Sequence, residues 1–457
     1  MRSAATTGHR RLLAGLLMTV ACASAADRCQ AAAGDEEALA ARLRRRVETL
    51  TAPALAGRAA GWPGGRAAVD TLAAWYAAAG LGPAFAGAWT QEFPLTGTGW
   101  TGDALAGRTG ANVGGTLAGD GRLAGRWLIV AAHLDHLGEL APEPATMSVP
   151  ADSAFFPGAN DNASGVAIVH ELARRLVSGS GAPAAGSDCR SVLLLNLDAE
   201  EVGLQGAAWF VDHAPVPMDS VDAMINLDTV GHLFDGRLIV SGLGTAAPLA
   251  SVVDVAAKSA DLDLNPSSGG WSGSDHMVFN TREVPVLFLF GGPYPEYNRP
   301  ADTAGRLDYP AMARVAVFTA ELVAGLRTVP GAFDWRLVAS GGLRDQAALA
   351  GSEPSAGGGG DRKNENKQTW LGTMPDFTEG QTGYRLAGVF DGSPAAAAGL
   401  QKGDLLVRFG DYPVSDLATF TTALWAYEPG DLVEVGVTRD GRDLRFTVAL
   451  GDRAQRR

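Results

Sequence analysis

Residues 193–206 read LLLNLDAEEVGLQG, an apolar run that ends in a cluster of carboxylates. A short apolar run flanked by turn residues is typical of a strand buried on both faces of a sheet. Ligands of open α/β sheets bind beyond the carboxyl ends of such strands, which is where Glu200 and Glu201 stand. Neighbouring residues of an extended segment point in opposite directions, so one carboxylate could bind a metal ion while the other transfers a proton. The alternative is a pair of solvated loop carboxylates.

The chain has 457 residues, of which 46% are hydrophobic and 19% are charged. This length exceeds one ordinary hydrophobic core, so two or more domains are expected. The composition is typical of a soluble globular protein. The formal net charge of −13 argues against a nucleic-acid partner, because phosphate binding needs a basic face.

The first 25 residues have the pattern of an export signal. Basic residues at 9–11 precede an apolar segment, 12–21, that is too short to cross a membrane, and the small residues 23–25 supply a cleavage pattern. We therefore expect a signal peptide over residues 1–25, a periplasmic or extracellular protein, and no membrane span. Lipid attachment at Cys22 is the alternative, which Thr19 disfavours because such signals prefer leucine there.

Two cysteines, Cys29 and Cys189, remain after such a cleavage. An oxidising compartment would allow a disulfide between them, but their spacing does not indicate one. They do not resemble a cysteine-type zinc site.

Strand and helix patterns alternate from residue 36 to residue 326, which predicts an α/β domain with a mostly parallel sheet. A Gly-rich polar stretch follows and reads as a flexible linker. After it come short strands with one or two helices, which predicts a second, smaller domain that is mainly β. The expected boundaries are 37–330 for the first domain, 331–367 for the linker and 368–452 for the second domain. The main strand candidates of the first domain are 127–132, 192–195, 223–227, 237–240 and 284–290, and the helix candidates include 36–50, 66–79, 249–260 and 309–326.

Candidate metal ligands stand at several of these strand ends. They are His133 with Asp135, Asp161 at a helix N-terminus, Glu200 with Glu201, and Asp228. A histidine that binds metal usually needs a carboxylate or carbonyl to fix its ring, and Asp135 is suitably placed in sequence. Imidazole with several carboxylates suits zinc, or a pair of divalent ions about 3.5–4 Å apart. Each residue alone has an ordinary structural explanation, but their shared position at strand ends favours a metal site.

Six motifs, in order, resemble one family of enzymes. They are AHLDHLG (132–138), GANDNASGVA (158–167), DAEEVGLQGA (198–207), INLDTVG (225–231), SDHMVF (274–279) and EYNRPADT (296–303). This set resembles the two-zinc aminopeptidases and carboxypeptidases of peptidase family M28, which are related to glutamate carboxypeptidase and the transferrin receptor. The resemblance covers residues 37–328. It implies a three-layer αβα sandwich with a mixed, mostly parallel sheet.

The resemblance also implies a role for each matching residue. His133 and Asp228 would hold one zinc ion, Asp161 would bridge two ions, and Glu201 would hold the second. Glu200 would be the general base that takes a proton from the metal-bound water, and Asp135 would orient His133.

One ligand departs from the family pattern. The family's last ligand is a histidine in a motif like YHRPxDT, and this chain has Asn298 in its place. A nearby family histidine is replaced by Tyr294. An amide oxygen is a hard, neutral ligand better suited to magnesium, calcium or manganese, so the second ion is expected to bind weakly or to be another metal. His276 or His136 could compensate, but the expectation for both is a supporting or core histidine.

The second domain resembles a PDZ domain of the type found in bacterial proteases. The matching residues are GSPA (392–395), AGLQKGDLL (398–406) and PGD (429–431). Such domains bind an extended peptide as an added strand and hold its terminal carboxylate on backbone N–H groups. The candidate loop is 371–374, and Pro375 removes one donor beyond it. An accessory domain with an empty groove is the alternative.

The leading hypothesis is an exported metal-dependent aminopeptidase that hydrolyses N-terminal residues from peptides. The second hypothesis is a degenerate peptide-binding member of the same fold, non-catalytic or with a single metal, because of Asn298. A one-metal acyltransferase related to glutaminyl cyclases is disfavoured, because those enzymes use the last histidine. A serine hydrolase is disfavoured too, since no Gly-x-Ser-x-Gly motif occurs.

Overall fold

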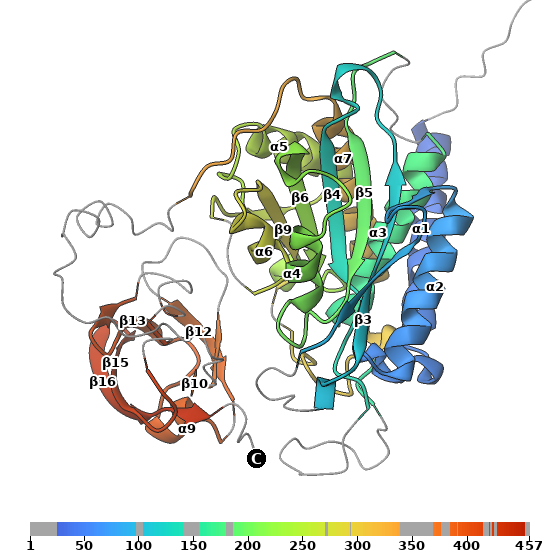
Figure 1. Cartoon of the computed structure of the whole chain (residues 1–457). Helices are drawn as coiled ribbons and strands as arrows, with labels where there is room; N and C mark the ends of the chain where they lie inside the picture. Colours follow the sequence, from blue (N-terminus) through green and yellow to red (C-terminus); the bar gives the residue numbers. More distant parts are fainter. Residues whose placement is uncertain are drawn as a thin grey trace, which may run out of the picture.

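The computed structural model describes two folded units (Figure 1). The described residues are 25–96, 104–139, 155–179, 186–269, 273–292, 294–338, 369–375, 384–390, 392–414, 420, 423–424 and 427–452. The predicted signal peptide, apart from Ala25, and residues 339–367 of the predicted linker lie outside them. The predicted domain boundaries stay predictions.

The first unit is built on a nine-stranded mixed sheet in the order β1-β3-β5-β4-β6-β9-β7-β8, with β2 beside β3 (Figure 1). Its centre is parallel, because β4 pairs in parallel with β5 and β6, and β6 pairs in parallel with β9. The flanks are antiparallel at the β3–β5 and β7–β9 pairs. The strands are β1 (Gly82–Pro83), β2 (Thr90–Pro94), β3 (Thr109–Leu117), β4 (Trp127–His133), β5 (Ser191–Leu197), β6 (Val221–Asp228), β7 (Leu238–Ser241), β8 (Leu264–Pro266) and β9 (Val286–Phe290).

Helices cover both faces of this sheet, which confirms the predicted three-layer sandwich. Alternate residues of β4 separate into two cores: Leu128 and Val130 face one layer of helices, and Ile129 and Ala131 face the other. The first layer contains α1 (Ala25–Leu50), α2 (Pro63–Ala79), α3 (Gly165–Val177), α5 (Leu249–Ala260) and α7 (Tyr309–Thr328), and the second contains α4 (Gln205–Asp212) and α6 (His276–Asn280).

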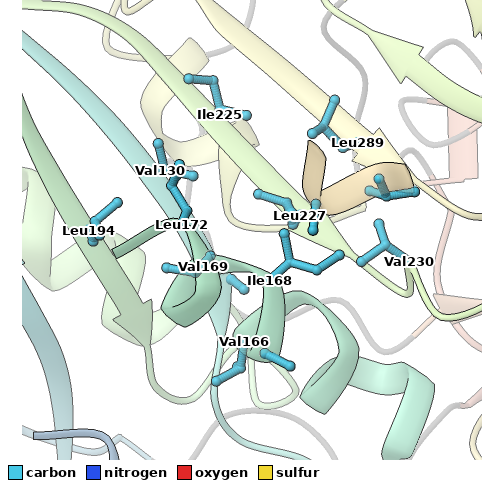
Figure 2. Packing of buried hydrophobic residues seen from close by; sticks show 14 of the residues in the cluster. Val130, Val166, Ile168, Val169, Leu172, Leu194, Ile225, Leu227, Val230 and Leu289 are labelled. Atoms are coloured by element: carbon cyan, nitrogen blue, oxygen red, sulfur yellow. The ribbon is translucent and has the colours of Figure 1, made fainter. Parts of the chain in front are cut away.

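Figure 2 shows how α3 packs on the parallel strands. Its Val166, Ile168, Val169 and Leu172 lie near apolar side chains of β4, β5, β6 and β9, and all four are buried. Each fully buried side chain of this kind contributes about 1.5–3 kcal/mol relative to an exposed one. This packing fixes α3, and therefore the loop before it, against the ends of the central strands.

One expectation about local structure is wrong, and one strand was not expected. Helix α1 begins at Ala25 and not at residue 36. Strand β3 was not predicted, because its sequence TGANVGGTL is rich in glycine and lacks an apolar run. Helix α2 (Pro63–Ala79) ends at residue 79 as predicted, and the next residue, Gly80, has a φ of 84°, which lies in the left-handed region that favours glycine.

Helix α7 is the one described helix that is long and apolar enough to cross a membrane. Of the most apolar 18-residue stretch of this helix, 61% is buried inside the first unit, so packing in a protein core explains its apolar character.

The second unit is a six-stranded antiparallel sheet with a short helix, consistent with the predicted PDZ-like domain. Its strand order is β11-β12-β13-β15-β16, with β14 beside β13, and a separate β10–β17 pair lies at its ends. The elements are β10 (Thr369–Trp370), β11 (Thr373–Pro375), β12 (Tyr384–Val389), α9 (Pro394–Ala398), β13 (Leu405–Phe409), β14 (Tyr412–Pro413), β15 (Leu432–Arg439), β16 (Arg442–Ala449) and β17 (Gly451–Asp452).

Candidate metal centre

Three predicted ligands come together at the carboxyl end of the sheet. His133 ends β4, Asp228 ends β6, and Asp161 lies in the turn before α3. His133 Nε2 is 3.2 Å from Asp161 Oδ1 and 3.4 Å from Asp228 Oδ1. All three residues are buried, and one ligand atom from each lies within 4.8 Å of the others. This group can hold a divalent metal ion through one nitrogen and two oxygens.

The topology explains why these residues meet. Strand β4 has β5 on one side and β6 on the other, so the strand order reverses at β4. Chains leaving adjacent parallel strands in opposite directions open a crevice at such a point, and ligands bind there. His133 and Asp228 end β4 and β6, and the Glu200–Glu201 loop follows β5, so all of them lie at this crevice.

Asp161 is held in place from outside its own loop. The carboxylate of Asp302 accepts hydrogen bonds from the backbone N–H of Asn160 at 2.8 Å and from that of Asp161 at 3.1 Å. It also accepts a hydrogen bond from the Tyr294 hydroxyl at 3.1 Å. Burial raises the pKa of Asp302 to about 6, although its backbone donors act in the opposite direction.

A second group forms around the other oxygen of Asp161. It contains Asp161, Glu201 and His136, whose ligand atoms also lie within 4.8 Å of one another. His136 Nδ1 is 2.6 Å from Glu201 Oε1 and 3.9 Å from Asp161 Oδ2. The two oxygens of Asp161 therefore face different groups, as a bridging carboxylate requires. The sequence had suggested that His136 could compensate for the histidine that Asn298 replaces, but the expectation was a supporting or core residue.

Asp135 contacts both His133 and the loop that carries Glu200 and Glu201. Its backbone carbonyl lies 3.2 Å from His133 Nδ1, and its carboxylate Oδ1 lies 3.7 Å from the same nitrogen. Its carboxylate also accepts the backbone N–H of Glu200 at 3.0 Å and that of Glu201 at 3.2 Å. Asp135 thus fixes the ring of His133 mainly through its carbonyl, and it fixes the loop that carries both glutamates through its side chain.

Glu200 belongs to neither ligand group. It is partly exposed and lies in the loop after β5, two residues beyond Asp198. Burial raises the pKa of the Glu200 carboxyl well above its usual value; the positive charge of His133 opposes this shift and the neighbouring carboxylates add to it. A glutamate beside a metal site, with its own carboxylate outside the ligand groups, can accept a proton.

The electrostatics of the site favour a bound cation. Burial raises the pKa of Glu201 to about 8, against the opposing effect of His133. Burial and the charge of Glu201 raise the pKa of Asp161. Burial also raises the pKa of Asp275 to about 7. Burial lowers the pKa of His133, but the carboxylates around it outweigh burial and raise that pKa well above its usual value. Several carboxylates packed this closely repel one another unless a proton or a cation joins them, so the residues present fit a divalent metal.

Arg58 is a site residue that the sequence did not reveal. It is 1% exposed and donates hydrogen bonds to four backbone carbonyls, those of Leu50, Leu134, Pro157 and Gly158. These carbonyls belong to the end of α1 and to the two loops that carry the histidines and Asp161. Burial lowers the pKa of Arg58 to about 10, which leaves it charged beneath the carboxylates. In the sequence, an isolated arginine after residues 55–57 (LAG) is typical of a surface position, and no motif indicates that it is buried at the site.

Asn298, the predicted replacement ligand, lies in the turn after β9. Its φ of 55° is left-handed, and its Oδ1 is buried without a hydrogen-bond partner among the described residues. Its role as a ligand stays a prediction. His276, the other histidine considered, is buried and stacks on Phe288 at 4.2 Å between ring centres. It belongs to neither ligand group identified in the described part of the chain.

Among the described side chains, Cys189 forms no disulfide. Cys189 is a buried free thiol next to β5, and Arg327 Nη2 lies 3.5 Å from its sulfur.

Two family models match the chain. Residues 112–323 match the model of "Peptidase family M28", and residues 367–450 match that of the PDZ domain. The first match contains the ligand groups described above, and the second contains the antiparallel sheet of the second unit.

Individual proteins are similar to parts of this chain. Aminopeptidase YwaD of Bacillus subtilis is 32% identical over 160 residues, which cover 33% of this chain and 33% of the relative. The chain thus matches about a third of the length of that protein. The solved structure of BSAP, a zinc aminopeptidase from Bacillus subtilis, is 16% identical with a TM-score of 0.50, and the alignment covers 64% of this chain and 96% of that one. LapA of Legionella pneumophila is 17% identical with a TM-score of 0.48 over 67% of this chain and 78% of that one.

Replacing Arg58 with methionine tests whether it holds the site together. R58M keeps a long side chain but leaves four carbonyls without their donors and removes a buried positive charge. We expect the free energy of unfolding to fall by about 3–5 kcal/mol in urea denaturation. The matched control is R45M, an exposed arginine on α1, where the change should stay within about 0.5 kcal/mol. Equal effects of the two substitutions would contradict this role of Arg58.

Proposed function

We propose that this protein is a metal-dependent aminopeptidase that removes N-terminal residues from peptides, because residues 112–323 match the model of peptidase family M28. The observation that carries the proposal is the convergence of His133, Asp161 and Asp228, with Glu201 beside them. These side chains come from separate segments, and a solvated surface cluster would not be buried as they are.

The donor set fits zinc. His133, Asp161 and Asp228 would hold one ion, and Asp161 with Glu201 would contribute to a second. Bound zinc supplies Lewis acidity that activates water, polarises the scissile carbonyl and holds the free amine of the substrate. The number of ions is part of the proposal.

Glu200 is the proposed general base. Its carboxylate takes a proton from the attacking water and passes it to the nitrogen that leaves when the peptide bond breaks. Asp135 acts through Glu200, because its carboxylate fixes the backbone of the Glu200–Glu201 loop. A positioned base of this kind typically contributes roughly 10²–10⁴-fold to the rate.

A degenerate, peptide-binding protein is the second candidate, and Asn298 is the observation that favours it. Without a histidine at position 298, the second ion would bind more weakly and hydrolysis would be slower. The position of His136 beside Glu201 and Asp161 argues against a crippled site, because it brings an imidazole nitrogen to the same group.

The second unit supports a proposed role in binding peptides. Strand β11 has β12 as its one strand partner in the described sheet, so its outer edge can accept an added strand. The loop before it is fixed, because Leu371 and Gly372 accept hydrogen bonds from the backbone N–H groups of Ala395 and Phe390. We propose that this edge binds an extended peptide with a free carboxyl terminus.

Export remains a proposal that rests on the basic, apolar and small-residue segments within residues 1–25. Mature protein purified from the periplasm or the medium should begin at Ala26 by N-terminal sequencing. A full-length chain retained in the cytoplasm would contradict export, and a lipid-modified Cys22 would replace soluble release with anchoring.

Replacing Glu200 with glutamine tests the proposed chemistry. E200Q removes the base but keeps size and hydrogen-bonding capacity, so kcat on aminoacyl-nitroanilides should fall roughly 10²–10⁴-fold. Metal content, measured by elemental analysis, should not change. The matched control is E321Q, an exposed glutamate on α7, which should retain full activity.

Two results would contradict the proposal. Equal activity of E200Q and the wild type would remove Glu200 from the mechanism. A metal-loaded wild type that hydrolyses no aminoacyl-nitroanilide and no peptide would favour the degenerate alternative.

Peptide binding by the second unit is tested with the full chain and fluorescent decapeptides that end in an apolar residue. The free-acid form should bind at least roughly tenfold more tightly than the C-terminal amide in fluorescence anisotropy, because the amide lacks the terminal charge. Equal binding of both forms, or none, would contradict the proposed mode.

A further inference from the structure

We propose that His136 is the nitrogen ligand of the second metal ion and takes the place that a histidine at position 298 would have in the family pattern. This inference rests on the metal site of the proposed function and assigns one of its ligands. It also explains how the chain could keep a two-ion site with Asn298 in that place.

The first argument is convergence on one atom. His136 Nδ1 lies 2.6 Å from Glu201 Oε1 and 3.9 Å from Asp161 Oδ2, so a single nitrogen faces two carboxylates from different segments. On the other side of Asp161, His133 Nε2 lies 3.2 Å from Oδ1. The site therefore has two similar halves that share Asp161, and each half has one imidazole and a further carboxylate.

The second argument is the fixed position of the ring. The His136 side chain is fully buried. It packs directly on the backbone of Gly158, where an added Cβ would lie 2.5 Å from both Cγ and Cδ2 of the ring. Gly158 also has a left-handed φ of 58°. A glycine is thus needed here to let the ring lie against the loop that carries Asp161, with Nδ1 directed at the carboxylates.

The third argument is ligand chemistry. Imidazole nitrogen is a stronger ligand for zinc than an amide oxygen, which better suits magnesium, calcium or manganese. Asn298 Oδ1 is buried without a partner among the described residues, and an amide oxygen of this kind would be the weaker zinc ligand. Of the two replacements, His136 supplies the donor that retains zinc.

The competing explanation is a simple hydrogen bond. His136 would then donate Nδ1–H to Glu201 and orient it, with no bond to metal. The same nitrogen cannot carry a proton and bind a metal ion, so the two roles exclude each other and can be separated by spectroscopy.

The direct test uses the wild-type chain loaded with two equivalents of Co²⁺ and proton NMR of the paramagnetically shifted signals. Each coordinated histidine gives its own exchangeable N–H signal outside the usual range. We expect signals from two histidines, His133 and His136. Signals from a single histidine, or a second set that survives in H136A, would overturn the proposal. This measurement on the wild type does not depend on how well a variant folds.

Metal titration with elemental analysis gives an independent test. The wild type and N298A should each bind two zinc ions, whereas H136A should bind one, with affinity for the second lowered by more than the roughly 10–100-fold expected when only an outer hydrogen-bond partner is lost. The matched control is H213A, an exposed histidine after α4, which should bind two. Loss of the second ion in N298A with retention in H136A would overturn the proposal.

The outcome is separable from that of the proposed function. Two bound ions with two coordinated histidines in a protein without peptidase activity would keep this ligand assignment and remove the aminopeptidase. An active enzyme with one coordinated histidine would support the aminopeptidase and overturn the assignment of His136 as a ligand.

Discussion

Repulsion among buried carboxylates is the constraint on which the rest of this structure depends. Asp161, Glu201 and Asp228 lie beside two histidines in a region almost closed to water. In the absence of a cation, burial and neighbouring carboxylates raise the pKa values of Asp161 and Glu201, whereas His133 outweighs burial and lowers the pKa of Asp228. Repulsion among these carboxylates opposes folding of the loops that carry them. Arg58 supplies one fixed positive charge beside the loops and donates hydrogen bonds to three of their carbonyls and to that of Leu50 at the end of α1. Divalent ions would supply the remaining charge, so the site that destabilises the metal-free chain is the one that would bind metal.

The fold gathers the mutually repelling carboxylates at one edge of the sheet. The strand order reverses at β4, so the segments after β4, β5 and β6 meet at one edge of the sheet. Apolar packing of α3 on these strands holds the Asp161 loop in the same place (Figure 2). Asp135 and Asp302 then fix the backbone of the two acidic loops through their carboxylates. Hydrophobic burial thus provides the stability that the acidic site needs.

Much of this architecture follows from the sequence, and the remainder depends on contacts between distant segments. The buried run before Asp198 predicted a central strand, and the polar residues after such strands predicted the ligand cluster. Strand β3 escaped prediction because it lacks apolar side chains and forms by pairing with β5. Arg58 and His136 escaped assignment for a different reason. Their partners are distant in sequence or lie in a loop whose path depends on the whole sheet, and neither has a local pattern that separates it from a core or surface residue.

Crystals of the zinc-loaded protein, with anomalous diffraction collected at the zinc edge, would test the central claim most directly. The account predicts two peaks on either side of Asp161, one about 2.0–2.2 Å from ligand atoms of His133 and Asp228 and the other at the same distance from Glu201. No peak among these residues, or ligand side chains that point away from a common centre, would contradict it.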